Sequence, residues 1–499
     1  MAQFGRLFSG AIWNVAGKLV QFALSLVALG VIARFIGPQA YGVFSLAWIA
    51  IGLVDIVVTA APTDTLVQRK EVTAGHLNAT FRASMTVALL AWGGLALGAG
   101  VIAGWLNGGA EFIALLPLRA ASLPLSALAV VPTALLMRQS RFKAIAATES
   151  VAGVVASITG LCLALAGAGI WSLLGMELAR GAIHAAMMIR LSRWRPRWAA
   201  RRSDFTDLLG FNASTWGAWG LGYVDEQLPR ALIGATLGPH ALGCYALADR
   251  LLSQLSAVLM VPAYQVVSAG VARIQHDLAA VRKLMAATLR LSALLACPLF
   301  LGLSAVAPTL VPAIFGEAWT DAVIPLQILM LLGIRASMSM IQVAVIRGLG
   351  KPNWHLAVGL LGVTFTVAGV SLALQWGLAG VAAAIVLRSV ALSPVHSMMI
   401  RRLVGLPIAA QYSAVARTLL GALPMAAGVW LATRWLATWL PRVPSLMVAA
   451  VLGVCLYWLF LRLFAPVVAR LAEQLVLAVI HRDLSKLRDL LAGAPPAHA

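Results

Sequence analysis

The sequence predicts an all-α integral membrane protein with about fourteen transmembrane helices, arranged as two parallel six-helix bundles plus two C-terminal helices. The first observation behind this prediction is composition. The 499 residues are 61% hydrophobic and only 11% charged, whereas a soluble protein carries roughly 25% charged residues. Because so few charged residues cannot cover a surface exposed to water, the chain is predicted to lie in the lipid bilayer. Its apolar runs are continuous rather than alternating, which favours helices over a β-barrel.

The second observation is a short sequence motif, the repeated phrase, which occurs twice in the chain, 201 residues apart. Residues 37–47 read GPQAYGVFSLA and residues 238–248 read GPHALGCYALA, with six of eleven positions identical. Such an internal repeat is typical of transporters built from two related halves. Because each half has an even number of spans, the halves are expected to be parallel. The phrase itself is predicted to form a turn at the outer ends of two helix pairs, where Pro and Gly supply the geometry.

The predicted spans follow from the need for about 20 apolar residues per transmembrane helix. They cover residues 10–33, 42–62, 81–104, 112–136, 145–166, 169–190, 211–235, 242–265, 284–306, 323–345, 355–375, 378–400, 413–434 and 446–464. The organisation predicted from them is an N-terminal bundle (1–190), a basic cytoplasmic linker (191–210), a C-terminal bundle (211–402), two additional helices (403–465) and a cytoplasmic amphipathic tail (466–499).

The net charge of +20, from 37 Lys+Arg against 17 Asp+Glu, has a topological explanation. A soluble protein with this balance would be a candidate for nucleic-acid binding. Here the basic residues crowd alternate loops, and positively charged loops stay in the cytoplasm. We therefore expect a multi-pass protein of the bacterial inner membrane with both termini in the cytoplasm, and no nucleic-acid partner.

Sequence signatures of catalysis or metal binding are missing. The chain has no Walker A loop, no HExxH and no GxSxG, and its cysteines and histidines lack metal spacing. We expect no cofactor, no metal and no catalytic residue. The short outer loops also disfavour a membrane glycosyltransferase or polymerase.

Polar residues inside the first and seventh spans form stripes in the same phase of the repeat. Asn14, Lys18 and Gln21 recur at helical spacing and therefore share one face. Adding 201 gives a face in the seventh span that includes Trp219 and Glu226. Tyr223 and Arg230 extend that face, and Asp225 lies beside it.

The second and eighth spans repeat the pattern. Trp48, Gly52, Asp55 and Thr59 share a face. The corresponding face of the eighth span begins at Asp249, with Arg250 beside it. We infer that spans 1, 2, 7 and 8 direct polar faces toward a central cleft.

Simpler explanations compete with function for other intramembrane polar residues. Glu177 and Arg180, one turn apart, are expected to form a structural pair, and Arg119 near a span end is expected to snorkel toward the interface. Gly94/Gly98 and Gly100/Gly104 have GxxxG spacing, which predicts close helix packing.

Four short phrases resemble the bacterial polysaccharide flippases of colanic-acid and xanthan type. They are Gly37–Gly42 after the first span, Leu66–Glu71 in the next cytoplasmic loop, Phe315–Ala322 before the tenth span and Arg347–Pro352 after it. The resemblance covers about residues 5–405. It implies the multidrug/oligosaccharidyl-lipid/polysaccharide exporter superfamily, with two six-helix bundles around a V-shaped cavity. The implied activity is alternating-access transfer of an undecaprenyl-diphosphate-linked oligosaccharide to the periplasmic leaflet, driven by a cation or proton gradient.

Candidate roles follow from combining this resemblance with the polar stripes. Cationic side chains would attract the diphosphate, aromatic rings would stack on sugars, and carboxylates would take up the coupling ion. The substrate-cavity candidates are Asn14, Lys18, Gln21, Trp216, Trp219, Tyr223, Arg230, Arg250 and Arg335. The coupling-ion candidates are Asp55, Asp225, Glu226 and Asp249.

Expected partners are the lipid-linked oligosaccharide, the bilayer, and a polysaccharide polymerase with its export machinery. Three alternatives stay open: a cation-coupled multidrug exporter of the same superfamily, a membrane glycosyltransferase or polymerase, and a peptidoglycan-precursor flippase.

Overall fold

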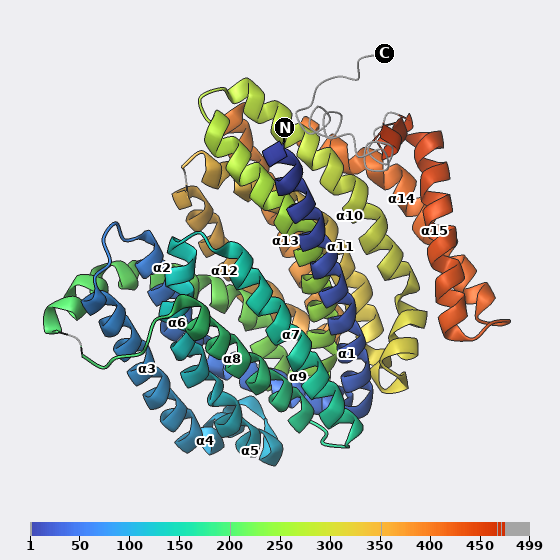
Figure 1. Ribbon diagram of the computed structural model, residues 1–499. Helices are drawn as coiled ribbons and strands as arrows, with labels where there is room; N and C mark the ends of the chain where they lie inside the picture. The colour runs from blue at the N-terminus through green and yellow to red at the C-terminus, as the bar shows by residue number, and fades with distance from the viewer. Residues whose placement is uncertain (1, 200, 351, 467, 471, 475–499) are drawn as a thin grey trace. The chain divides into compact units, whose positions relative to one another are not determined.

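The computed structural model describes residues 2–199, 201–350, 352–466, 468–470 and 472–474, and every regular element in these residues is a helix (Figure 1). The predicted all-α class is confirmed. Side chains are described for this part of the chain except in segments 2–24, 202–203, 206–219, 269 and 352–358. The predicted amphipathic tail therefore lies almost entirely outside the described residues. The α-helices are α1 (Ala2–Asp55), α2 (Ala61–Gln68), α3 (Ala74–Leu97), α4 (Ala99–Leu106), α5 (Gly109–Ala120), α6 (Ser122–Arg138), α7 (Phe142–Leu165), α8 (Trp171–Ser192), α9 (Arg202–Ile274), α10 (Leu278–Ile314), α11 (Val323–Gly348), α12 (Pro352–Ala373), α13 (Gly377–Val404), α14 (Ile408–Leu436) and α15 (Arg442–Phe464).

The chain forms two compact units, Met1–Ala246 and Leu247–Ala499. Their boundary lies within α9, not in the linker at 191–210. The six-helix limits drawn from the sequence stay predictions.

The number of spans agrees with the sequence once bends are counted. Ten segments of the described residues are long and apolar enough to cross a membrane. Three of them turn at a glycine with positive φ, namely Gly37 in α1, Gly238 in α9 and Gly377 between α12 and α13. Counting each of these as two gives thirteen. The fourteenth is α8, which has spanning length but is interrupted by charged residues.

Exposed side chains support a lipid surface. Large apolar residues such as Leu97 and Val454 are more than two-thirds exposed, which a soluble protein of this size could not sustain across so many helices. The most exposed tryptophans of the described residues lie at or next to helix ends: Trp105, Trp376, Trp435 and Trp439. Tryptophans at such positions anchor spans at the membrane–water interface.

The repeated phrase forms the same turn in both copies. Gly37 has φ 70° and ψ 171°, and Gly238 has φ 84° and ψ 175°. Glycine adopts these angles without a Cβ penalty, and the proline that follows is preorganised to begin the next helix. The predicted turn is therefore confirmed.

The two turns also pack against each other within the first unit. A Cβ on Gly42 would lie 1.7 Å from the Pro239 carbonyl oxygen, and a Cβ on Gly243 would lie 1.9 Å from that of Pro38. The contact is reciprocal: the second glycine of each phrase lies against the proline carbonyl of the other phrase. Asn107 completes it by donating a 2.9 Å hydrogen bond to the Ala235 carbonyl. That oxygen would otherwise lack its helical donor, since residue 239 is a proline.

The predicted GxxxG contacts are wrong for the described residues. A Cβ on Gly94, Gly100 or Gly104 would meet nothing within 4 Å, and one on Gly98, between α3 and α4, would meet only Gly94 and Ile102 of the adjoining turns. The spacing permits close packing, but no neighbouring helix of the described chain covers this face of α3 and α4. Close backbone approach occurs instead at the repeated phrase.

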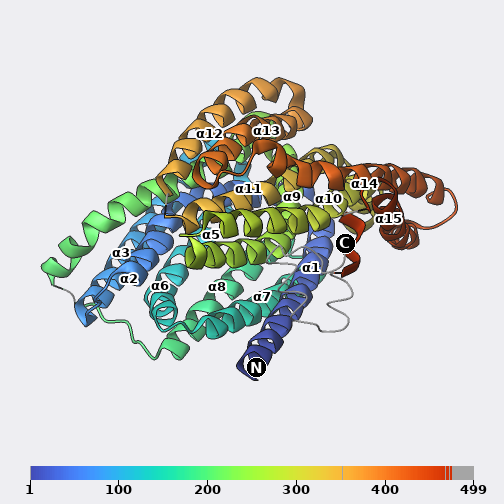
Figure 2. The same cartoon turned by 90° about the horizontal axis from the view of Figure 1, so that it is seen from above.

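In the first unit, α7 and α8 pack against each other, α6 packs on α8, and α3 packs on α6 (Figures 1 and 2). Arg138 closes one end of this bundle: its Nη1 donates to the carbonyls of Leu66 (2.9 Å) and Val67 (3.2 Å) at the end of α2. The linker is held on α3, because Trp194 and Trp198 both contact the Phe81 ring edge-to-face.

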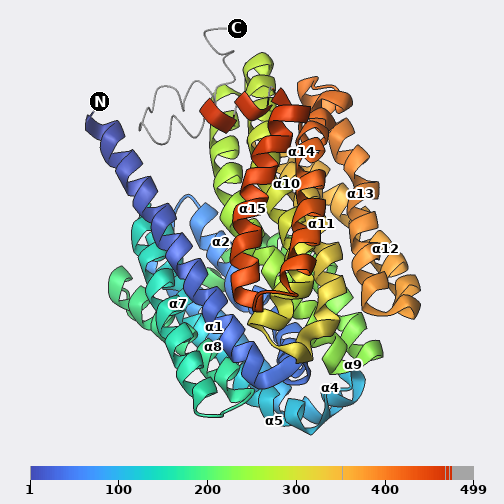
Figure 3. The ribbon, with the colours of Figure 1, turned by 90° about the vertical axis from the view of Figure 1, so that its right-hand side faces the viewer.

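In the second unit, α10 packs against α11, α14 and α15, and α12 packs on α13 (Figure 3). A buried amide network joins three of these helices. Gln342 Nε2 donates to Ser397 Oγ (3.1 Å) and to Gln411 Oε1 (3.0 Å), and all three residues are fully buried.

The Phe315–Ala322 phrase has a structural role. Phe315 and Trp319 are buried against each other, and Gly316 has φ 97° at the start of the 3₁₀ helix η2 (Glu317–Ala322). The phrase therefore shapes the connection between α10 and α11.

Candidate functional site

A buried arginine of the first unit is at the centre of the candidate site. Arg119 on α5 is only 3% exposed, and its Nη2 lies 3.7 Å from Glu177 Oε1 on α8. The sequence-based expectations for both residues are wrong. Arg119 does not snorkel, because neighbouring helices enclose it, and Glu177 pairs across helices with Arg119.

Two aromatic rings on the second half of α1 flank this guanidinium. Its carbon lies 4.7 Å from the Phe44 ring centroid and 4.6 Å from that of Trp48. Such contacts stabilise a cation by about 0.5–2 kcal/mol each. Nε and Nη1 nevertheless have no hydrogen-bond acceptor, so the arginine is only partly satisfied in this conformation.

Asp55 brings a second carboxylate to the cluster. It lies beside Ser126 and within electrostatic reach of Arg119 and Glu177, and its backbone carbonyl accepts a 2.7 Å hydrogen bond from the Thr59 hydroxyl. Directly after Asp55 the chain forms a π-helical turn, η1 (Ile56–Ala60). Such turns are rare and occur frequently at functional sites.

Tyr223 on α9 reaches the same face of α1. Its hydroxyl donates to the Ile49 carbonyl at 3.0 Å, and a Cβ on Gly52 would lie 2.1 Å from the hydroxyl oxygen. Glycine at position 52 therefore makes room for the tyrosine. The predicted face of Trp48, Gly52 and Asp55 is thus in contact with one predicted residue of the seventh span.

The charges of this cluster do not balance. With both carboxylates ionised, Arg119, Glu177 and Asp55 would carry one excess negative charge. Leaving a net charge within a membrane-spanning bundle is unfavourable. One proton or one monovalent cation would neutralise it. Among the described residues, no group of three His, Cys, Asp or Glu side chains could hold a metal ion.

The other predicted residues of the seventh span surround Tyr223 on α9. Arg230 Nη1 donates to Gln227 Oε1 at 2.9 Å, and both Arg230 and Glu226 lie within electrostatic reach of the Tyr223 hydroxyl. Asp225 is half-buried and Glu226 is exposed.

The remaining candidates divide into two groups. Asp249 and Arg250 on α9 and Arg335 on α11 belong to the second unit and are half-buried. The side chains of Asn14, Lys18, Gln21, Trp216 and Trp219 lie outside the described residues, so their positions stay predictions.

Sequence reasoning missed Arg119 and Glu177 as members of the site. The usable signal was that each interrupts an apolar span with a charge of opposite sign. The two charges were assigned structural roles because the 201-residue repeat compares spans 1, 2, 7 and 8 only, whereas these residues lie on α5 and α8.

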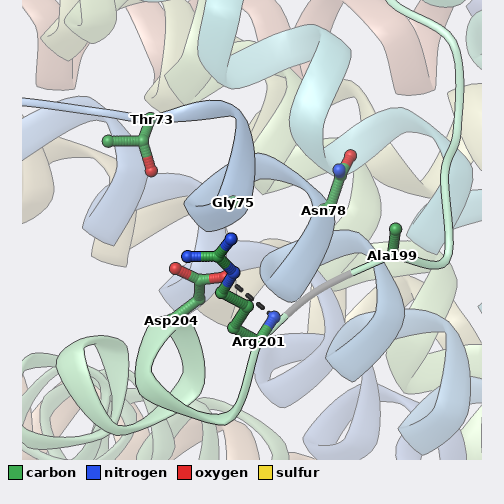
Figure 4. Close-up of a pocket in the computed structure, with 6 residues that line it drawn as sticks. All are labelled: Thr73, Gly75, Asn78, Ala199, Arg201 and Asp204. Carbon is green, nitrogen blue, oxygen red and sulfur yellow. Dashed lines mark hydrogen bonds between the residues drawn. The ribbon is translucent and has the colours of Figure 1, made fainter.

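A hollow of about 560 Å³ lies where the linker meets α3 (Figure 4). Thr73, Gly75 and Asn78 line it from the start of α3, and Ala199, Arg201 and Asp204 from the linker and the start of α9. The Asp204 carboxylate accepts a 2.9 Å hydrogen bond from the Arg201 backbone N–H, and a Cβ on Gly75 would lie 2.7 Å from each of its oxygens. Asp204 thus supplies the negative charge that a helix N-terminus favours. This arrangement docks the linker.

Comparison with known proteins gives a family and a fold. The family described as "Polysaccharide biosynthesis protein" matches residues 31–324. The chain is 25% identical over 313 residues to the succinoglycan biosynthesis transport protein ExoT of Rhizobium meliloti, over 62% of this chain and 63% of that protein. It is 23% identical over 352 residues to the lipopolysaccharide biosynthesis protein WzxC of Escherichia coli, over 66% and 68% of the two chains. The match thus spans just under two thirds of the length of ExoT.

Solved structures with the same architecture include transporters. The lipid II flippase MurJ, in an inward closed conformation, superposes with a TM-score of 0.74 at 13% identity, over 95% of this chain and 100% of that chain. An inward-facing multidrug resistance MATE transporter of the MOP superfamily superposes with a TM-score of 0.58 at 14% identity, over 78% and 98%. At such identities the likeness shows a shared fold.

Proposed function

The chain belongs to the polysaccharide biosynthesis protein family, and from that premise we propose that it is a flippase for lipid-linked oligosaccharides. It moves undecaprenyl-diphosphate-linked repeat units from the cytoplasmic to the periplasmic leaflet by alternating access. The product serves exopolysaccharide, capsule or O-antigen synthesis. The relatives named for succinoglycan transport and lipopolysaccharide biosynthesis support this substrate class.

The observation that carries the proposal is the cluster formed by the buried Arg119 and the half-buried Glu177 and Asp55. Ionisable groups are expensive inside a membrane, and those present usually mark the path of a substrate or an ion. The cluster joins α5 and α8 to the α1 segment that follows the repeated turn, and Asp55 lies on that segment. A transporter function explains why such groups lie deep in an apolar bundle.

We propose further that this cluster couples transport to a cation gradient. Its one excess negative charge is neutralised by a proton or a monovalent cation at Asp55. Loading Asp55 leaves Arg119 paired with Glu177, as in this conformation. When the ion leaves, the Asp55 carboxylate becomes a second anion that Arg119 can bind through Nε and Nη1, which are unpartnered in this conformation. Formation of this pair shifts α1 relative to α5 and α8.

The setting proposed for this activity is the bacterial inner membrane, with both termini in the cytoplasm. Basic residues on alternate loops support that orientation. A polysaccharide polymerase and its export machinery would take the product at the outer face.

A clean deletion of the gene tests the flippase proposal. We expect surface polysaccharide to disappear and its lipid-linked repeat unit to accumulate in the membrane, both restored by the wild-type gene. Polysaccharide staining of whole cells and chromatography of the extracted lipid-linked sugars measure the two effects.

Other outcomes of the same strain identify the alternatives. Normal polysaccharide with increased drug sensitivity would contradict the proposal in favour of a multidrug exporter. A lethal deletion with loss of peptidoglycan precursors at the outer leaflet would indicate a peptidoglycan-precursor flippase. Sugar transfer by the purified protein would indicate a glycosyltransferase or polymerase.

A further inference from the structure

An apolar groove runs along the second unit between α11 and α14. It encloses about 300 Å³, and α10, which packs against both helices (Figure 3), contributes Leu301 to its wall. The α14 residues recur every three to four positions and so line one helical face. The lining residues are Leu301, Leu331, Ile334, Arg335, Met338, Tyr412, Val415, Leu419 and Leu423.

Arg335 is the charged residue of this lining. Its Nη1 contacts the Ser339 hydroxyl on the same helix, and its Nε has no hydrogen-bond partner. No carboxylate of the described residues pairs with it. A half-buried guanidinium in an apolar wall is costly unless an anion reaches it. The groove therefore combines an apolar trough with a single site for negative charge.

The depth of Arg335 indicates which anion this would be. It lies at the middle of α11, about 18 Å along the axis from Val323 at 1.5 Å per residue. The hydrocarbon core is about 30 Å thick, so the headgroups of resident lipids stay near its faces. Only a lipid headgroup in transit between leaflets reaches the middle of a span.

We propose that this groove holds the hydrocarbon chain of the lipid-linked substrate while Arg335 binds its diphosphate halfway across the membrane. The ligand class is an anionic diphosphate on a long prenyl chain. This assignment rests on the proposed function, which supplies such a lipid. Arg335 and Leu419 become residues that select the lipid carrier, independently of the sugars attached to it.

The buried amide network of Gln342, Ser397 and Gln411 marks one end of the groove. Gln342, two turns beyond Arg335 on α11, is bonded to Gln411 next to the lining residue Tyr412. Both amides are fully buried, and their Nε2 atoms already donate to Ser397 Oγ, to Gln411 Oε1 and to backbone carbonyls. An apolar chain gains nothing there, so it is expected to extend from Arg335 toward Leu423 and Leu301.

Binding to the purified full-length protein in detergent tests this proposal. The probes are undecaprenyl diphosphate without sugar, the uncharged undecaprenol, and phosphatidylglycerol as a resident-lipid competitor. Arg335→Gln should weaken diphosphate binding about tenfold, because it removes a charge-assisted hydrogen bond, and leave undecaprenol binding unchanged. Leu419→Trp, which fills the groove, should weaken binding of both prenyl probes. Arg335→Lys should keep part of the affinity.

Matched controls lie on the same helices. Arg347→Gln removes an exposed charge at the end of α11, and Leu420→Trp enlarges an exposed residue beside Leu419 that does not line the groove. Both should bind like wild type, and thermal unfolding in detergent checks that every variant is folded. If Leu419→Trp does not fold, Leu423→Trp at the exposed rim replaces it.

Three results would overturn the groove assignment: unchanged binding in both Arg335→Gln and the groove-filling variant, equal loss in the controls, or competition by phosphatidylglycerol as strong as by the diphosphate. Failure of the proposed function is distinguishable. It would show as normal polysaccharide in the deletion strain while the purified protein still binds undecaprenyl diphosphate through Arg335 and Leu419.

Discussion

At the scale of single residues, Arg119 sets the charge balance of the first unit. It is paired with Glu177, flanked by Phe44 and Trp48, and left with two unused donors. Breaking a buried pair by removing one partner costs about 3–5 kcal/mol, because the other charge stays buried. The arginine is therefore structural whatever else it does, and the coupling role must be tested at its neighbour Asp55.

We predict different phenotypes for these two residues. Arg119→Leu should lower the amount of folded protein in the membrane, because Glu177 and Asp55 lose their counter-charge. Asp55→Asn should keep normal abundance, since Arg119 and Glu177 stay paired, but should abolish gradient-driven export. Immunoblotting of membranes and polysaccharide assays separate the two effects.

Glu111→Gln provides the matched control, since it neutralises an exposed carboxylate at the start of α5, the helix that carries Arg119. It should export normally. Normal export by Asp55→Asn would contradict the coupling role, and loss of the protein itself would indicate that Asp55 is structural.

At the scale of elements, the repeated turns bring the backbones of the two repeats into close contact. Gly42 and Gly243 each face the carbonyl of the other phrase's proline, at distances that leave no room for a Cβ. The matching φ and ψ values of Gly37 and Gly238 show that both halves reach this contact through the same geometry. The contact joins the ends of two helical hairpins.

Alanine at either glycine should force these ends apart. We predict that Gly42→Ala and Gly243→Ala each reduce export severalfold while the protein stays in the membrane, because helix propensity favours alanine and only the contact is lost. A disulfide between cysteines placed at Gln39 and His240 should form less readily in the alanine variants than in the cysteine pair alone.

Gly100→Ala is the control at this scale, because its Cβ would meet nothing within 4 Å. It should export normally and leave cross-linking unchanged. Wild-type export and cross-linking in both Gly42→Ala and Gly243→Ala would show that the contact is dispensable.

The helical spans were easier to predict from the sequence than the contacts between them. Apolar runs gave the spans because length and hydropathy decide membrane insertion, and the turn at Gly37 followed from its glycine and proline. The packing partner of Gly42 was not predictable, since GxxxG spacing at Gly94 and Gly100 gives a stronger local signal and packs against nothing described. Which face of a helix meets which neighbour depends on tertiary arrangement.

The candidate site was predictable only in part, for the same reason. Asp55 and Gly52 were found because the repeat aligns them with a polar face in the other half. Arg119 and Glu177 come from α5 and α8, and sequence gives no register between those helices. Their pairing required the fold.

At the scale of the whole molecule, each unit contributes one feature that carrying a charged lipid across an apolar barrier would need. The first unit supplies a charge-imbalanced cluster for an ion, and the second supplies an apolar groove with a guanidinium at mid-depth. Each feature has an ordinary structural explanation by itself. Their presence in one chain of this family is what a lipid-linked oligosaccharide flippase requires.

The most direct test of this claim is translocation by the purified protein in liposomes. The lipid-linked oligosaccharide that accumulates in the deletion strain is incorporated into both leaflets, and a sugar-cleaving enzyme that cannot cross the membrane is added outside. With wild-type protein and a cation gradient, the cleaved fraction is predicted to rise from about half toward completion as inner-leaflet lipid reaches the outside. A cleaved fraction that stays at the level of protein-free liposomes would contradict the account.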